Sequence, residues 1–349
     1  MGKYTAIDDP SAYFQCELYT GNSSTNAITF SGNSDMKPDL VWQKRRDAAY
    51  YHRLWDSNRG VTKYLASNDS IAEATFGYVS SFDTDGITFG SSDQSVNVNG
   101  GSYVLWNWKA NGGTTSSNTD GSKTATVQAN QDAGFSIITY AGSGSASTVG
   151  HGLADTPDVI IFKNRSAANV WATYHQGLGN NLKLELNGTG AQDADGSFMN
   201  GTLPTSSVFT VGASVNTNGS GSNYVAYCFA EKQGYSKFGR YTGSGNANGP
   251  FIYTGFRPAY VLIKPDGANN HWVAMDTTRD EYNGGGTAYI FPNANEGQQT
   301  AYERMDFLSN GFKLRTNGGE WNGSGRNILY MAFAEHPFVT STGAPVTAR

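Results

Sequence analysis

YVAYCFAEKQGYSKFGRY, residues Tyr224–Tyr241, joins the closing strand of one predicted β-unit to the opening strand of the next. Its first part, YVAYCF, is similar to YVLWNW at Tyr103–Trp108 and to ILYMAF at Ile328–Phe333. In each case the residue seventeen positions before the closing strand is expected to end a turn; these residues are Gly86, Ser207 and Gly311. One spacing found in three places indicates an internal repeat, and a repeat governs every local prediction.

Two further patterns recur with the closing strand. The opening stretches AYFQCELYTG, GFSIITYAG and GYSKFGRYTG end at Gly21, Gly142 and Gly243. A glycine-rich loop follows each, and then a proline and a lysine enclose five mostly apolar residues; these blocks are Pro38–Lys44, Pro157–Lys163 and Pro258–Lys264. Such a run predicts a strand buried on both faces, with proline at its start where no ladder hydrogen bond is donated. The lysine is expected where the strand returns to the surface.

A tryptophan strand is expected to pair with each of these buried strands through a polar turn. Its tryptophans are Trp55, Trp171 and Trp272. They fit either core side chains or sugar-binding platforms, and an aromatic residue repeated at one strand position favours the core. Asp56 and Arg59 match Asp276 and Arg279 and predict a structural ion pair, whereas the middle copy has Tyr174 or His175 at that place.

These patterns predict an all-β protein of three tandem β-sandwich (jelly-roll or lectin-like) repeats of about 100 residues each. The predicted parts are an N-terminal arm (1–11), segment one (12–109), a Thr/Ser/Gly/Asn-rich linker (110–131), segment two (132–231), segment three (232–338) and a C-terminal tail (339–349). The short EKQG junction predicts that segments two and three form a close pair and that segment one is held more loosely. A single barrel or prism with one shared three-fold core is the alternative.

Composition restricts the classes of partner. The net charge is −5 and charged residues make up only 15% of the 349, so no basic face is expected for nucleic acid. No apolar run has the length of a membrane helix, and the first residues lack the apolar part of a signal peptide. The protein is therefore expected to be made in the cytoplasm. Cys16 and Cys228 can be free thiols or one bridge, and the sequence leaves both open.

The sequence gives no sign of catalysis. The five histidines lack metal-ligand spacing, and neither a nucleophile elbow nor a phosphate loop occurs. DTDG at 83–86 and DADG at 193–196 resemble calcium loops but lack the distal glutamate, and they are interpreted as turns. No pair of carboxylates stands out as a glycosidase site. We therefore predict a non-enzymatic protein without a cofactor or metal.

Sugar binding is the one site hypothesis that the residues suggest. NGGEWNGSG places Trp321 between Glu320 and Asn322 in a glycine-rich loop, where an exposed indole and polar neighbours would form a glycan platform. A single platform binds weakly, so affinity would have to come from several sites acting together.

Long stretches of the chain resemble the repeat modules of virion structural proteins of tailed bacteriophages, particularly marine phages. The resemblance rests on HGLADTPDVIIFKNRS, SGSNYVAYCFAE, GYSKFGRYTGSG and GPFIYTGFRPAYVLIK, with MDFLSNGFKLR and YMAFAEHPF near the end, and it covers nearly the whole chain. Segment one departs from the pattern, having SGNSDMKPD and WNWKA where the others have HGL and FAE blocks.

The resemblance implies a virion protein without an enzymatic site, of the tail-fibre-like, receptor-binding or head-decorating kind. We expect a surface protein that contacts a host glycan or other virion proteins, assembled as a homo-oligomer, in particular a trimer. The N-terminal arm would attach it to the particle, and its removal would spare the fold. A capsid decoration or cement protein is the alternative, and a polysaccharide depolymerase is the third possibility.

Overall fold

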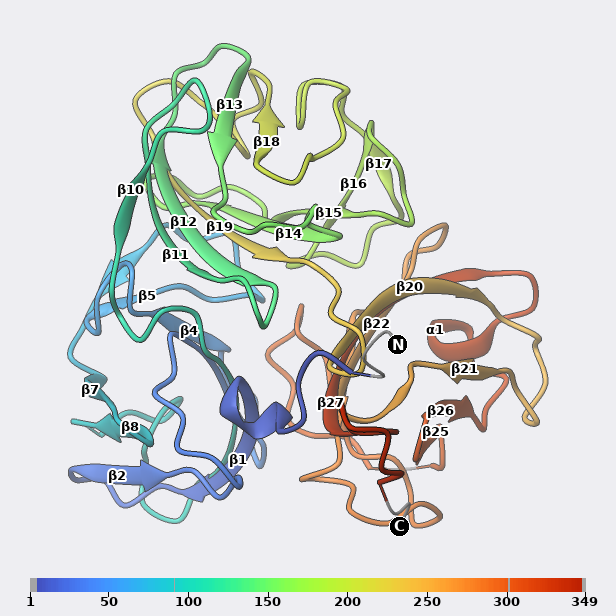
Figure 1. The fold of residues 1–349 in the computed structure, drawn as a ribbon. Helices are drawn as coiled ribbons and strands as arrows, with labels where there is room; N and C mark the ends of the chain where they lie inside the picture. The colour runs from blue at the N-terminus through green and yellow to red at the C-terminus, as the bar shows by residue number, and fades with distance from the viewer. Residues whose placement is uncertain (1–4, 91, 301, 347–349) are drawn as a thin grey trace.

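The computed structural model describes residues 5–90, 92–300 and 302–346 as an all-β fold of several antiparallel sheets (Figure 1). The two helical elements in these ranges are short: a 3-10 turn η1 (Pro10–Ala12) and α1 (Gly319–Asn322). None of the described helices has the length and hydropathy needed to cross a bilayer. The predicted fold class is confirmed at this level.

Three large sheets share one strand order, in which the closing strand lies between the opening strand and the proline-started strand. Segment one gives β1 (Phe14–Thr20), β9 (Ser102–Trp108), β3 (Leu40–Arg45) and β4 (Arg53–Asp56), in that order. Segment two gives β12 (Phe135–Ala141), β19 (Asn223–Phe229), β14 (Val159–Asn164), β15 (Ala172–His175), β16 (Leu182–Glu185) and β17 (Asp193–Ala194). Segment three gives β20 (Ser236–Thr242), β27 (Asn327–Pro337), β22 (Phe256–Pro265), β23 (Val273–Asp276) and β24 (Tyr289–Ile290).

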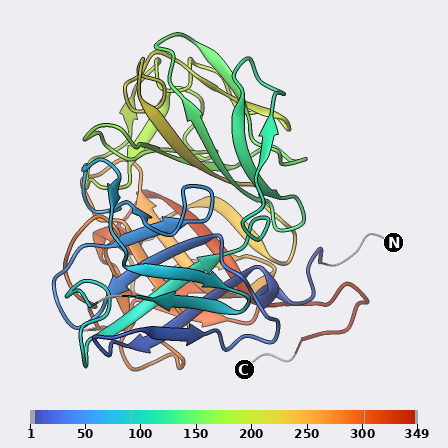
Figure 2. The same cartoon turned by 90° about the vertical axis from the view of Figure 1, so that its left-hand side faces the viewer.

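A smaller sheet accompanies each large one (Figure 2). These sheets are β2 (Asn26–Thr29), β8 (Gly86–Phe89) and β7 (Val79–Asp83); β13 (Ser147–Gly150) and β18 (Val208–Val211); and β21 (Phe251–Tyr253), β26 (Gly311–Leu314) and β25 (Met305–Leu308). A further two-stranded sheet in segment one joins β5 (Lys63–Tyr64) to β6 (Ala74–Thr75). Gly86 and Gly311 start their strands as predicted. In segment two, Val208 begins the strand, one residue after the predicted Ser207.

The predicted linker is largely part of a sheet. Within 110–131, β11 (Ala125–Asn130) pairs with β12, and β10 (Ser116–Asn118) pairs with β11, so both extend the large sheet of segment two. A linker separate from the segments over the whole of 110–131 is therefore wrong. The reason lies in TATVQAN, whose alternating Ala125 and Val127 are buried in segment two.

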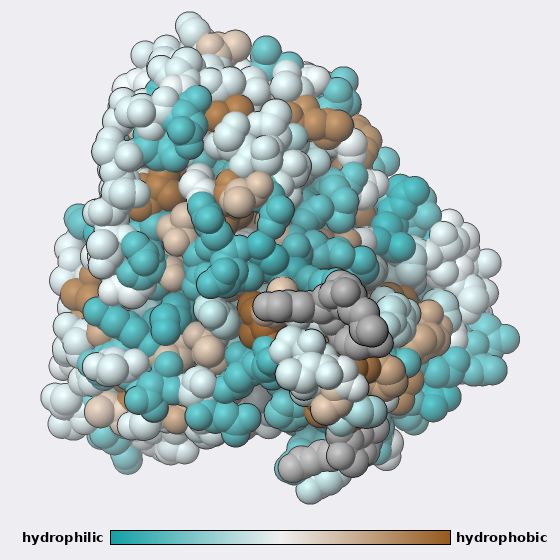
Figure 3. Space-filling model, viewed as in Figure 1, coloured by the Kyte–Doolittle hydropathy of each residue, from teal (hydrophilic) through white to brown (hydrophobic). Residues whose placement is uncertain are grey.

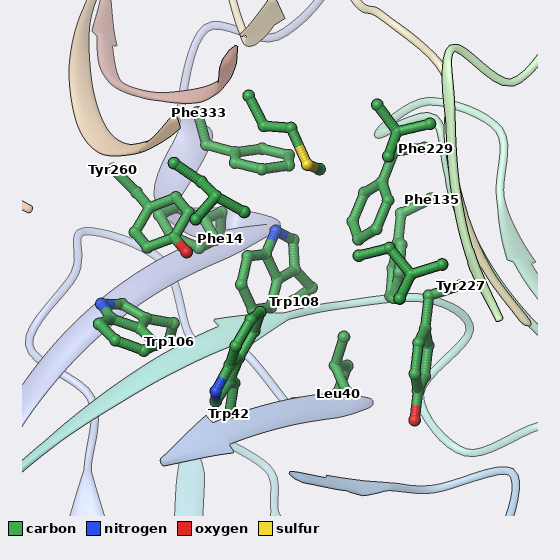
Figure 4. Close-up of a cluster of buried hydrophobic side chains, with 14 of the residues drawn as sticks. Phe14, Leu40, Trp42, Trp106, Trp108, Phe135, Tyr227, Phe229, Tyr260 and Phe333 are labelled. Carbon is green, nitrogen blue, oxygen red and sulfur yellow. The ribbon is translucent and has the colours of Figure 1, made fainter. Parts of the chain in front are cut away.

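One core is common to all three segments. Trp108, Phe229 and Phe333 lie at matching register positions, since each pairs with the residue two after the proline: Leu40, Val159 and Tyr260. Their ring centroids are 6.2, 5.6 and 5.8 Å apart, so one aromatic side chain from each closing strand meets the other two (Figure 4). Segment one therefore packs as closely as the others, and the expectation that it is held loosely is wrong.

Hydrogen bonds close a ring around this core. Strand register aligns His52 with Trp171 and Trp272, so Trp55 is not the counterpart of these tryptophans, contrary to the sequence alignment. The three side chains contact matching carbonyls of the preceding segment in the ring: His52 Nε2 with Phe291 O at 3.1 Å, Trp171 Nε1 with Ala66 O at 2.8 Å, and Trp272 Nε1 with Glu185 O at 2.9 Å. All the tryptophans concerned are buried, as the core interpretation predicted.

The lysines that end the three Pro-to-Lys blocks lie inside the protein. Lys44, Lys163 and Lys264 are fully buried, so the expectation that they mark a return to the surface is wrong. Each ammonium donates to two backbone carbonyls; for Lys163 these belong to Ser70 of segment one and Asn169, at 2.9 and 2.7 Å. Desolvation lowers the pKa of Lys44 to about 7 and those of the other two to about 8.

The described part of the N-terminal arm is built into the fold. Ile7 is 5% exposed and belongs to the common core, and Ala6 N donates to Gln233 O at 2.9 Å. The C-terminal tail contacts the arm, because Ser341 N donates to Asp8 Oδ1 at 2.6 Å. Residues 1–4 and 347–349 lie outside the described ranges. Because Thr5 and Ile7 are buried, the arm is part of the folded protein and its removal is expected to reduce stability.

Candidate functional site

Trp321, the predicted glycan platform, is a core residue. Its side chain is turned inward by α1 and is 2% exposed, with its ring edge-on to Tyr289 at 5.1 Å. Its carbonyl accepts a hydrogen bond of 2.7 Å from Tyr241 Oη. No indole face is left for a sugar, so this part of the prediction is wrong.

Asn322 holds the loops of segment three together. It is fully buried, its Oδ1 accepts from Ser244 N at 2.6 Å, and its Nδ2 donates to Asn246 O and Thr316 O at 2.7 and 2.8 Å. With these bonds made, its amide is not available to a ligand. The predicted binding role of Asn322 is therefore wrong as well.

The other segments explain why asparagine stands there. Asn97 and Asn218 are fully buried at the same distance before their closing strands, and their amides tie together the loops of segments one and two in the same way. Glu320 alone among the three predicted residues is partly exposed, in the first turn of α1. The NGGEWNGSG pattern thus encodes a structural turn.

The repeated Asp–Arg pair is a buried contact between segments. Asp56 accepts from Arg59 and, at 2.7 Å, from Tyr227 Oη of segment two. Asp276 likewise accepts from Arg279 and, at 2.8 Å, from Trp106 Nε1 of segment one. All four charged side chains are fully buried, which agrees with the structural interpretation.

In segment two, a neutral histidine stands at the position that holds the aspartate of the Asp–Arg pair in segments one and three. Strand register aligns His175 with Asp56 and Asp276. Its Nδ1 accepts from Gly177 N at 3.0 Å, so Nε2 carries the proton that faces Tyr330 O at 3.2 Å. Burial lowers the pKa of His175 to about 4, and the ring has no carboxylate to charge it. His175 therefore has a structural role at the contact between segments two and three.

A polar pocket opens between segments one and three. At the junction between segments one and two, the side chain of Asn58 donates to a backbone carbonyl at 2.9 Å, and Gln176 does the same between segments two and three. Between segments one and three, the side chain of Thr278 is shorter and lies 3.5 Å from Cys16 O. The space that remains is lined among others by Glu17, Glu335, His336 and Thr277.

The carboxylates of this pocket have structural partners. Glu17 is 8% exposed and accepts from Ser31 N at 2.5 Å, and burial raises its pKa. Glu335 Oε2 accepts from Arg257 Nε at 2.6 Å. The pocket can take a polar group, but these two acids are not arranged as a general acid and base with a common target.

Cys16 and Cys228 are both free and buried, which settles the open question about a bridge. Cys16 belongs to the common core, whereas Cys228 belongs to the separate core of segment two. Burial raises the pKa of both thiols, so they act as small apolar residues.

Exposed aromatic side chains gather on segment three. Among the described residues, seven aromatic side chains are exposed: Tyr51 and Phe76 in segment one, and Phe251, Tyr253, Tyr282, Tyr302 and Phe338 in segment three. The view in Figure 3 is mostly white and teal, with brown limited to small patches. On a surface with so few apolar patches, several exposed aromatic rings on one segment indicate a place where a partner or ligand can bind.

Phe251 and Tyr253 lie on the same face of β21, an edge strand, and are 45% and 60% exposed. Ile252 between them points the other way, into the core of segment three. The inward-facing middle residues of the matching strands, the partly buried Ile28 and the buried Val149, identify the counterparts; these are Ala27 and Thr29 in segment one and Thr148 and Gly150 in segment two. Only segment three has aromatic residues at these two places.

A second polar pocket adjoins Tyr253. It is lined by the 231–237 junction between segments two and three, with Glu231, Gln233 and Lys237, and by the turn after β21, with Thr254 and Gly255. Lys237 Nζ donates to Glu231 Oε1 at 2.5 Å, and both side chains are partly exposed. Sequence reasoning missed this site, although the alternation in PFIYTG and its absence from the other two segments were visible signals.

Among residues 5–90, 92–300 and 302–346, no group of three or more His, Cys, Asp or Glu is arranged to hold a metal ion. No curated protein matches the chain in sequence. A family match, however, extends over residues 9–337, which cover all three segments except residue 338, and it is described as a domain of unknown function, DUF7483. The chain therefore belongs to the DUF7483 family.

Proposed function

We propose that the protein is a non-enzymatic structural protein of a tailed-phage virion. In this proposal it is displayed on the particle surface and contacts a host glycan or neighbouring virion proteins. The resemblance of its fixed sequence blocks to phage virion modules supports the setting. Its buried carboxylates support a structural role, because Asp56 and Asp276 are fully engaged with arginine and aromatic partners.

The proposal includes an origin by repetition. We infer that segments one to three are copies of one β-sandwich module, of the jelly-roll or lectin-like kind, joined around a common core. The shared strand order supports this inference, as do Tyr19, Tyr140 and Tyr241, which occupy one register position and each donate to a carbonyl before the closing strand. Copies that share a scaffold can keep the fold while one of them changes its surface for binding.

The observation that carries the binding role is the aromatic pair of β21. Phe251 and Tyr253 stand where the other segments have Ala, Thr or Gly, and they contribute little to the core beneath them. Exposing two rings gives no stability to an isolated domain, since the hydrophobic effect favours their burial. Segment three is therefore the part of the protein that we expect to face a partner.

Localisation and binding test the proposal together. Gradient-purified particles should contain the protein, and an electron cryo-microscopy map should place segment three outward, with subunits in a symmetric trimer. A protein that is absent from particles would contradict the virion role. A position flat on the capsid shell, with β21 covered by capsid protein, would favour the decoration alternative. Release of reducing ends from host polysaccharide would favour the depolymerase.

A further inference from the structure

We propose that the pocket beside Tyr253 binds a neutral saccharide, with Tyr253 and Phe251 as its stacking platform. This inference rests on the proposed function, which it deepens by naming the site and the class of ligand. The platform predicted at Trp321 is buried, so Tyr253 and Phe251 replace it as the candidate platform of segment three.

The spacing of the two rings suits an extended ligand. Side chains two positions apart on one strand face lie about 7 Å from each other. Because β21 is at the edge of its sheet, it is paired with a neighbouring strand on one side only, β26. Gly311, paired with Tyr253, adds no side chain to this face, and Lys313 pairs with Phe251. An elongated ligand can therefore lie along the strand across both rings.

The polar groups of the pocket match hydroxyl groups. Gln233 is exposed and can both donate and accept, Glu231 accepts, and Lys237 donates. The apolar C–H face of a sugar ring packs on aromatic rings while its hydroxyls bind such side chains. One aromatic wall and three hydrogen-bonding side chains provide both kinds of contact at a single place.

The charge of the pocket favours a neutral ligand. Among the described lining residues the charged side chains are Glu231 and Lys237, and these neutralise each other across 2.5 Å. An anionic or cationic ligand would have to compete with this pair for its partner. A neutral polyhydroxylated ligand can bind to both members without separating them.

Binding to an array of neutral and charged glycans tests the inference, with the full chain and four variants. Y253A, F251A and the double variant F251A/Y253A remove exposed rings from the platform, and Y302A removes a tyrosine of similar exposure elsewhere on segment three, where Tyr302 is 67% exposed. We expect each platform variant to lose about tenfold or more in affinity for a neutral glycan, as central aromatic contacts commonly do, and Y302A to bind like the unaltered protein. Circular dichroism and an unchanged Tm should confirm that all variants are folded.

The results separate the site from the function. Unchanged neutral-glycan binding by the double variant F251A/Y253A would overturn the site while leaving a glycan-binding virion protein in place. If the unaltered protein bound only charged glycans, the proposed ligand class would be wrong but the virion role would stand. The same holds if it bound no glycan and was nevertheless present in particles. Absence from particles together with absence of glycan binding would overturn both.

Discussion

Replacing Phe333 by alanine should weaken all three segments at once. Phe333 lies at the centre of the common core, 1% exposed, with its ring 5.6 Å from that of Trp108 and 5.8 Å from that of Phe229. It also packs on rings within segments one and three; these belong to Phe14, Tyr235, Phe238 and Tyr260. The cavity left by the missing ring would therefore border every segment.

The expected loss follows from the size of that cavity. A fully buried Phe→Ala change costs about 3 to 5 kcal/mol of unfolding free energy. Unfolding entropy is about 2.1 cal/mol/K per residue, so for this chain length the loss corresponds to a decrease of about 4 to 7 °C in Tm. Calorimetry measures the decrease, and native-state hydrogen exchange shows where protection is lost.

The control is F312A in the separate core of segment three, where Phe312 is fully buried. We expect F333A to reduce the protection of amides in β9 and β19 as well as β27. F312A should reduce protection first in β26, which contains Phe312, and in the two strands paired with it, β21 and β25. If F333A left β9 and β19 as protected as in the unaltered protein, the segments would be independent domains and the shared core would not hold them together.

Three further outcomes are expected. D276A leaves the buried Arg279 guanidinium without its carboxylate and should cost about 3 to 5 kcal/mol in urea unfolding, whereas D47A, whose ion pair with Arg45 is partly exposed, should cost about 0 to 1 kcal/mol. Burial lowers the pKa of Lys44 from 10.5 to about 7, so between these pH values the unfolded chain binds the extra proton. Stability should therefore rise with pH by up to about 1.4 kcal/mol per unit in that window; K44M should reduce the slope in a pH series of urea titrations, and an unchanged slope would contradict the assignment. Removing residues 1–11 takes Ile7 out of the common core and should lower Tm measurably; a truncated protein as stable as the full chain would show that the arm is dispensable for folding.

Several elements were predictable because they depend on local chemistry. The Pro-to-Lys blocks contain apolar, β-branched residues that suit buried strands, and all three form the predicted central strands. The Asp–Arg pairs were also foreseen, since Asp56 and Arg59 recur as Asp276 and Arg279 at the same spacing.

The alignment of the tryptophans failed because residue type is a poor guide to register. His52 and Trp171 each place a ring N–H against a backbone carbonyl of the neighbouring segment. Either an imidazole or an indole can donate this hydrogen bond, so the contact does not require the same residue type in each segment. Trp55 resembled the other tryptophans in the sequence but fills the core of segment one. Only strand pairing could distinguish the two.

The sequence by itself determined the strands, their turns and their threefold recurrence, because alternation, proline and glycine act over a few residues. The tertiary structure alone decided which side chains are accessible. Lys44 and Trp321 were expected at the surface and are buried, whereas Tyr253 was unremarked and is exposed. The reason is that burial depends on which sheets pack together, and three segments that enclose one core bury some faces and leave others open without any local signal in the chain.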